Sequence, residues 1–287
     1  MQIPGFTYDR VATPDGTRLN VAVGGTGTPV VLLHGFPQTH LMWRHVAADL
    51  VSDHTVICPD LRGYGDSDKP ADTGDTYAKR TMATDVVAVA RALGHERFAL
   101  AGHDRGALVA FRAGLDHPAA ITHLACLDVL PTLDMWDVLH GATAAVGFHL
   151  YLMAQPPGLP ETMIGAAPDA FFGHFLDAWA TEAFPPDVRA AYLAASRNAV
   201  TSIVADYRAS ATVDVEHDRR DRDAGTRLSM PVTVLQQDWG AYLGYDATAL
   251  WRAWAPGLTH VTVSSGHFMA EQGPAEVIKH LRELLTR

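Results

Sequence analysis

The chain is poor in cysteine and has no long apolar run. Its two cysteines, Cys58 and Cys126, each lie in an apolar stretch, which predicts buried packing residues rather than a disulfide. No CxxC pair suggests a metal site. No apolar run approaches the roughly 20 residues needed to span a bilayer, and the first residues lack the pattern of a secretory signal. We therefore expect a cytoplasmic protein with no membrane partner.

Basic residues are also scarce. The 22 lysines and arginines are outnumbered by 32 acidic residues, so the 287-residue chain carries a net charge of −10. This balance argues against a nucleic-acid partner, which would require clustered positive charge. An anionic small-molecule substrate is compatible with it, but only if positive residues line the pocket. The acidity itself is typical of a well-solvated surface.

What the chain does contain is an alternation of short apolar strands and helical patterns. Residues 6–11 and 17–23 flank Pro14-Asp15-Gly16 and predict a hairpin. Further strands are expected at 29–33, 54–58, 97–101 and 121–127, with helices near 41–51, 78–93 and 105–117. Strands that are apolar on both faces and alternate with helices are typical of a parallel sheet covered on both sides.

The pattern changes after Pro131. Residues 131–225 contain helix-like pieces broken by prolines and no strand-like run. Strand and helix patterns return with strands at 231–236 and 258–263, a helix near 246–254 and a final helix from 274. We therefore expect an α/β core formed by residues 1–130 and 226–287. The helical segment 131–225 would be a cap over the C-terminal ends of the strands, where ligands bind in open α/β sheets.

The stretch Gly102-His-Asp104-Arg-Gly106 lies between a strand and a helix. A small-x-nucleophile-x-small stretch in that position is typical of a nucleophile elbow, although the central residue is usually serine. Here it is Asp104, and the start of the following helix favours its negative charge. The alternative interpretation is an ordinary aspartate N-cap, which is common.

Partners elsewhere in the chain favour the elbow. His267 follows the last strand, where the catalytic base of such folds is found. Asp128 and Asp238 each end a strand, and either could orient the histidine, because triad acids are recognised by geometry. The loop after residues 29–33 contains Phe36, and its backbone N–H, with that of Arg105, would form an oxyanion hole.

A carboxylate nucleophile selects the reaction. Attack on an acyl carbon would give an anhydride, whereas attack on an alkyl carbon displaces a leaving group and gives a stable ester. His267 would then activate water to hydrolyse that ester. The electrophile should therefore contain a carbon–halogen bond or an epoxide, and no metal or organic cofactor is required.

Five segments together resemble the fluoroacetate (haloacetate) dehalogenases of the α/β-hydrolase superfamily over nearly the whole chain. They are His34-Gly-Phe-Pro-Gln-Thr39, Asp60-Leu-Arg-Gly-Tyr-Gly65, Gly102-His-Asp-Arg-Gly-Ala107, Leu127-Asp-Val-Leu-Pro-Thr132 and Asp206-Tyr-Arg208. The resemblance implies that Asp128 rather than Asp238 is the triad acid. It also implies that Arg105 holds a substrate carboxylate and that His149 and Tyr207 hydrogen-bond the departing halide. Without the resemblance, a packing histidine and a helix tyrosine would be the simpler interpretations of the last two.

Two positions depart from the family. Leu108 stands where the family has a second carboxylate-binding arginine, and Leu150 stands where it has a halide-binding tryptophan. Losing the arginine removes a charge-assisted contact worth roughly 1.5–3 kcal/mol. We therefore expect weak or absent activity on fluoroacetate and a preference for chloro- or bromo-substituted acids or larger substrates.

Two other functions are compatible with these residues. An epoxide hydrolase would use the same Asp104, His267 and Asp128, with a tyrosine of the helical segment (Tyr151, Tyr192 or Tyr207) protonating the epoxide oxygen. A ligand receptor on a hydrolase scaffold would need none of this machinery. The sequence favours a haloacid dehalogenase acting on a small molecule, and a homodimer is possible.

Overall fold

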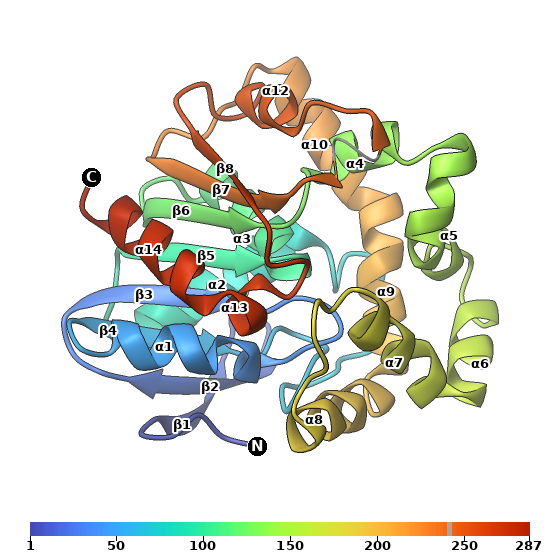
Figure 1. Ribbon diagram of the computed structural model, residues 1–287, viewed down its shortest axis with the longest axis horizontal. Coiled ribbons are helices and arrows are strands. Elements are labelled where there is room, and N and C mark those ends of the chain that lie inside the picture. Colours follow the sequence, from blue (N-terminus) through green and yellow to red (C-terminus); the bar gives the residue numbers. More distant parts are fainter. Residues whose placement is uncertain (240–242) are drawn as a thin grey trace.

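The computed structural model describes residues 1–239 and 243–287, and they are organised around one eight-stranded sheet (Figure 1). The strands are β1 (Thr7–Ala12), β2 (Arg18–Gly24), β3 (Thr28–Leu33), β4 (His54–Pro59), β5 (Phe98–His103), β6 (Ile121–Leu127), β7 (Val232–Gln237) and β8 (Thr259–Val263). Their order across the sheet is β1-β2-β4-β3-β5-β6-β7-β8. Every strand predicted from the sequence is present within one or two residues of its expected bounds.

The first two strands form the predicted hairpin, and β2 joins the sheet by pairing antiparallel with β4. From β4 to β8 all neighbouring strands are parallel. The parallel strands β3, β5 and β6 are almost wholly buried, which explains their continuous apolar sequences. The thiols of Cys58 and Cys126 are free and buried in this core, as predicted.

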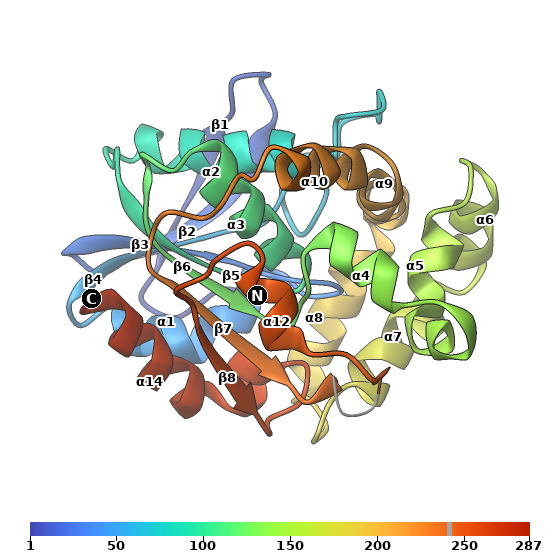
Figure 2. The ribbon, with the colours of Figure 1, turned by 90° about the horizontal axis from the view of Figure 1, so that it is seen from above.

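Helices cover both faces of the sheet, as Figure 2 shows. On one face lie α1 (Arg44–Leu50) and α14 (Pro274–Leu285), which pack against each other. On the other face lie α2 (Lys79–Ala92) and α3 (Arg105–Asp116). Shorter elements are η1 (His40–Trp43), α12 (Ala247–Arg252) and α13 (Met269–Gln272). The short α13 was not predicted from the sequence.

A helical segment connects β6 to β7. It contains α4 (Thr132–Val138), η2 (Gly141–Gly147), α5 (Phe148–Met153), α6 (Leu159–Ala166), α7 (Pro168–Ala178), α8 (Pro186–Arg197), α9 (Val200–Ala211) and α10 (Val213–Asp223). Prolines divide it, because Pro168 and Pro186 each occupy the first position of a helix, where a missing N–H costs nothing. In Figure 1 helices α5 to α9 stand beyond one edge of the sheet.

The C-terminal ends of the parallel strands lie on the side of the sheet that faces these helices. The register places Leu33 beside Gly102, His103 beside Leu127, and Leu127 beside Leu235. The residues that follow these strands are therefore brought together beneath the helical segment. None of the helices in the described ranges is both long and apolar enough to cross a membrane.

Candidate active site

Asp104 occupies a strained turn between β5 and α3. Its φ angle is +48°, in the region that L-residues rarely adopt. Two glycines make the turn possible: a Cβ atom on Gly102 would lie 2.3 Å from the carbonyl oxygen of Gly106, and one on Gly106 would lie 2.4 Å from that of His34. Although Asp104 precedes α3, its side chain makes no capping hydrogen bond to that helix. The N-cap interpretation therefore does not account for this carboxylate.

The carboxylate instead contacts the loop that follows β3. The backbone N–H of Phe36 donates to Oδ1 of Asp104 at 2.8 Å. This approach requires glycine at the preceding position, because a Cβ atom on Gly35 would lie 2.6 Å from the Cβ atom of Asp104. His34 anchors the loop: its Nδ1–H donates to the Gly35 carbonyl, and its Nε2 accepts from the Leu61 N–H. The Phe36 N–H therefore reaches the Asp104 carboxylate, while an oxyanion hole formed by Phe36 and Arg105 stays a prediction.

His267 and Asp128 form a hydrogen-bonded pair beside Asp104. Nδ1 of His267 lies 2.6 Å from Oδ2 of Asp128. The same carboxylate accepts two hydrogen bonds from Gln237, one from its side-chain amide at 2.7 Å and one from its backbone N–H at 3.0 Å. Of the two acids that the sequence left open, the geometry brings Asp128 to the histidine. Asp238 has an exposed position after β7.

The three histidines of this region differ in their tendency to carry charge. Burial lowers the pKa of His267, but the hydrogen bond and charge of Asp128 and the charge of Asp104 outweigh it, so the pKa is raised above its ordinary value. Burial dominates for the other two: it lowers the pKa of His103 to about 4 and that of His149 to about 3. His103 Nε2–H donates to the His267 carbonyl oxygen at 2.8 Å and so helps to hold His267 in place. His149 is neutral at pH 7.

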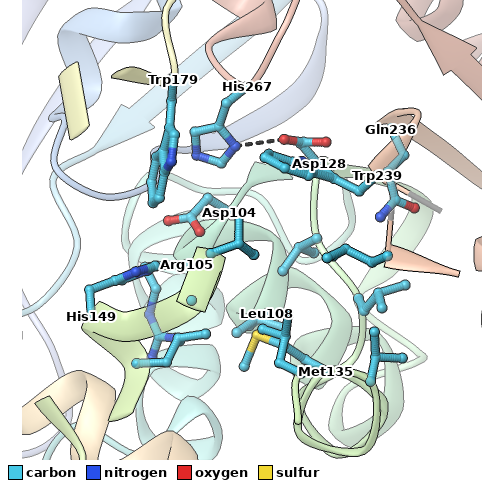
Figure 3. Close-up of a pocket in the computed structure, with 18 of the residues that line it drawn as sticks. Asp104, Arg105, Leu108, Asp128, Met135, His149, Trp179, Gln236, Trp239 and His267 are labelled. Carbon is cyan, nitrogen blue, oxygen red and sulfur yellow. Dashed lines mark hydrogen bonds and ion pairs between the residues drawn. The ribbon is translucent and has the colours of Figure 1, made fainter. Parts of the chain in front are cut away.

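Asp104, Asp128 and His267 line one cavity of about 120 Å³. Figure 3 shows Asp104 facing the space between His267 and Trp179, with Leu108 and Met135 on the opposite side of the cavity. Most of the other lining residues are apolar. Besides the residues already named, the described residues that line the cavity are Val129, Leu130, Val138, Leu139, Val146, Gly147, Leu150, Leu243, Arg105, His149, Tyr207, Gln236, Trp239 and Tyr245.

The residues that the resemblance assigned to substrate binding all line this cavity, namely Arg105, Leu108, His149, Leu150 and Tyr207. Among the three tyrosines considered as proton donors, only Tyr207 belongs to the described lining. Tyr192 donates its hydroxyl to Glu271, and Tyr151 donates its hydroxyl to the Leu139 carbonyl.

The guanidinium of Arg105 is held by an acid that sequence reasoning did not assign to it. Its Nε donates to Oδ2 of Asp206 at 2.9 Å, and Nη2 donates to Oδ1 at 3.0 Å. Nη2 also donates to the Asp206 carbonyl and to the Ser210 hydroxyl. The ring of Tyr207 lies under the guanidinium, 4.1 Å from its carbon atom. The arginine is 1% exposed.

Sequence reasoning missed Trp179, Gln237 and Trp239. The Trp179 ring contacts the rings of His149 and His267, with ring centroids 5.1 and 4.8 Å apart. An indole therefore borders this part of the cavity, although Leu150 stands where the family has a tryptophan. No sequence signal marks Trp179, which follows α7 in the helical segment. Gln237 and Trp239 carried a usable signal, because they stand at the carboxyl end of β7.

The fold and the cavity define an α/β hydrolase, and comparison with known proteins agrees. The family model for the α/β hydrolase fold matches residues 28–274, and the chain belongs to that family. Within residues 1–239 and 243–287 no group of three or more metal-ligating side chains is assembled.

Particular relatives refine the picture. The chain is 38% identical to a fluoroacetate dehalogenase from Burkholderia sp, over 98% of this chain and 94% of that one. It is 32% identical to a soluble epoxide hydrolase from Corynebacterium sp. (strain C12), over 92% of each. A solved structure of an α/β-fold protein from Nostoc sp PCC 7120 superposes with a TM-score of 0.94 at 39% identity and covers both chains fully. The resemblance predicted from the sequence is therefore confirmed.

Proposed function

We propose that this protein is a cofactor-independent hydrolase that cleaves a carbon–halogen bond through an ester on Asp104. One observation carries the proposal: an aspartate occupies the nucleophile elbow in the same cavity as a histidine that is hydrogen-bonded to a second carboxylate. A serine in that position would attack acyl carbon, whereas a carboxylate attacks alkyl carbon. The similarity to a fluoroacetate dehalogenase supports the halide as leaving group.

In the first step, Oδ2 of Asp104 attacks the carbon that bears the halogen. A carbon–oxygen bond forms, and the carbon–halogen bond breaks with its electron pair leaving on the halide. Oδ1 is the oxygen that accepts the Phe36 N–H, so it becomes the carbonyl oxygen of the ester. His149 and Tyr207 line the cavity and are the proposed hydrogen-bond donors to the departing halide.

In the second step, Nε2 of His267 takes a proton from water, and the water oxygen attacks Cγ of Asp104. The negative charge that develops on Oδ1 is stabilised by the Phe36 N–H and, in this proposal, by the Arg105 N–H. Collapse expels the alkoxide, which receives the proton from His267. The products are an alcohol, a halide ion and a proton, and Asp104 regains its carboxylate with one oxygen from water. Asp128 holds Nδ1 of His267 so that Nε2 faces the cavity.

The helical segment 131–225 acts as a cap in this proposal. It supplies the walls of the cavity opposite the strand ends, from α4, η2, α5 and α9. A cap of this kind reduces the access of bulk water to the ester. The core would then comprise residues 1–130 and 226–287.

Epoxide hydrolysis is the second candidate. It needs the same aspartate and histidine and a proton donor to the epoxide oxygen, and Tyr207 lines the cavity as such a donor. The similarity to a soluble epoxide hydrolase favours it as well. In that reaction the leaving oxygen stays attached to the alkyl group, so the product is a diol.

The decisive experiment traps the ester. A His267→Ala variant, and in parallel His267→Asn, is incubated with alkyl halides and with styrene oxide, and its intact mass is measured. Without the base, an ester should accumulate on Asp104 and its mass identifies the alkyl group. Asp104→Asn is the matched control, which should gain no mass. If neither histidine variant gains mass from any alkyl electrophile, the protein does not use this chemistry.

A further inference from the structure

Arg105 is the one permanently charged cation among the described residues that line the cavity, and its charge is already balanced. Asp206 accepts from Nε and Nη2 of Arg105 and also forms an ion pair with Lys79. Lys79 lies 3.7 Å from a second carboxylate, that of Asp214. Two cations therefore face two anions, and the group as a whole carries no excess positive charge.

The carboxylate of Asp206 remains ionised within this group. Burial alone would raise its pKa, but the charges and hydrogen bonds of Arg105 and Lys79 outweigh burial and hold the pKa below its ordinary value. The Tyr64 hydroxyl also donates to this carboxylate, at 2.6 Å. The positive charge of Arg105 is therefore balanced by the Asp206 carboxylate at any pH at which the enzyme would work.

The hydrogen bonds that Arg105 already makes also prevent it from binding a substrate carboxylate through two nitrogen atoms. An arginine holds a carboxylate through two neighbouring nitrogen atoms, either Nε with Nη2 or Nη1 with Nη2. Both pairs include Nη2, whose two hydrogens are already directed at Asp206 and at the hydroxyl of Ser210. Leu108, one helical turn further along α3, is 1% exposed and offers no charge. A substrate carboxylate beside the negative Asp104 would thus meet little compensation.

The cavity beyond Asp104 is apolar. The apolar side chains that line it include Leu108 of α3, Met135 and Val138 of α4, Val146 of η2 and Leu150 of α5. Figure 3 shows Leu108 and Met135 on the side away from His267.

From these observations we infer that the substrate is an uncharged alkyl electrophile with an apolar arm of several carbons that lies along Leu108 and Met135. This inference rests on the proposed function, because it assumes that Asp104 attacks an alkyl carbon. It replaces the small haloacid that the family resemblance implies with a neutral, longer molecule. Burial of the apolar arm would supply the binding that an arginine pair supplies to a haloacid.

The test uses two substrates of one shape that differ in charge. Bromide release by the wild-type protein is measured with α-bromohexanamide, which is neutral, and with α-bromohexanoate, which is anionic; bromoacetate is the short anion. Asp104→Asn gives the background rate. We expect kcat/KM for the amide to exceed that for the hexanoate by at least about tenfold, and bromoacetate to be the poorest of the three. A preference for either acid would overturn the inference.

Trapping the ester distinguishes a failure of this inference from a failure of the proposed function. His267→Ala should gain the mass of the amide-derived group in preference to that of either acid. An ester formed only from the acids contradicts the inference but upholds the chemistry of Asp104. No ester from any of the three, together with none from an alkyl epoxide, refutes both.

Two substitutions test the wall directly. Leu108→Arg should reverse the preference towards the acids, whereas Leu108→Met, which conserves volume, should retain the preference for the amide. Met135→Trp should block the apolar arm and lower the rate with α-bromohexanamide by about tenfold or more, and by a larger factor than the rate with bromoacetamide. Met163→Trp, on the exposed surface of α6, is its matched control. If Met135→Trp and Met163→Trp changed the rates equally, or if Met135→Trp lowered the rates with both amides by the same factor, the proposed path of the arm would be contradicted.

Discussion

Nδ1 of His267 lies 2.6 Å from Oδ2 of Asp128, although 139 positions separate the two residues in the chain. Parallel pairing of β6, β7 and β8 brings them together, because Asp128 follows β6, His267 comes after β8, and these strands end on the same side of the sheet. The hydrogen bond fixes which nitrogen of the histidine faces the cavity. It also raises the pKa of His267 against the effect of burial.

Asp128→Asn should therefore change the pH dependence of the second step. The base acts in its neutral form, so the wild-type rate rises with pH through the pKa of His267, which is above its ordinary value of about 6.5. Without the carboxylate, burial dominates and lowers that pKa, so the acid limb of the kcat profile should move to lower pH. The plateau should fall by roughly 10³–10⁴, because the tautomer is no longer fixed. A profile with an unmoved acid limb would show that another group titrates.

Gln237 holds the acid from the other side, through two hydrogen bonds to Asp128. Gln237→Ala removes the side-chain donor and leaves the backbone one. We expect kcat to fall by roughly tenfold, which corresponds to one lost hydrogen bond of about 1–1.5 kcal/mol. Because the effect acts through Asp128 and His267, only the second step should slow, and the ester on Asp104 should accumulate in the steady state.

Intact-mass measurement during turnover checks this expectation, with single-turnover halide release as the measure of the first step. Gln155→Ala, an exposed change in the helical segment, is the control. Slower halide release in the Gln237 variant without ester accumulation would mean that Gln237 serves the structure as a whole rather than the base.

Much of the placement of the candidate site could be predicted from the sequence, because it follows local rules. Asp104, Asp128 and His267 each stand directly after, or within a short loop of, an apolar strand, and parallel strands deliver such residues to one edge. The glycines around Asp104 likewise follow from the tight turn alone. None of these placements requires knowledge of the helical segment.

The surroundings of Arg105 could not be predicted in this way. Its partner Asp206 lies 101 positions away on α9, and only the tertiary placement of that helix near the start of α3 brings the two together. The apolar wall depends on the same kind of information. Met135 and Val146 lie in short helical pieces whose sequence shows no strong periodicity, so the face that each turns towards the cavity is set by tertiary contacts.

The ion group around Asp206 should be important for stability. Asp206→Asn leaves Arg105 and Lys79 buried without a full counter-charge, and breaking a buried pair in this way costs about 3–5 kcal/mol. For a chain of this length the Tm should fall on the order of 10 °C. Asp169→Asn breaks an exposed ion pair with Arg197 and should change the Tm little. Calorimetry of the two variants makes the comparison, and similar Tm values would show that the buried group contributes no more than a surface pair.

His149 should matter in proportion to the difficulty of the leaving group. Its pKa is lowered to about 3, mainly by burial, so at pH 7 it is neutral and one ring nitrogen still carries a proton to donate. Among the described residues, its Nδ1 is a buried atom with no hydrogen-bond partner.

His149→Phe keeps a ring in the same place and removes the donor. Because fluoride leaves less readily than chloride, and chloride less readily than bromide, the loss in kcat/KM should grow from bromide to chloride to fluoride. We expect roughly tenfold for bromide and more for the others. Measurement uses one alkyl skeleton with the three halogens, and His174→Phe, an exposed change on α7, serves as the control. The same loss for all three halogens would mean that His149 shapes the cavity without touching the leaving group.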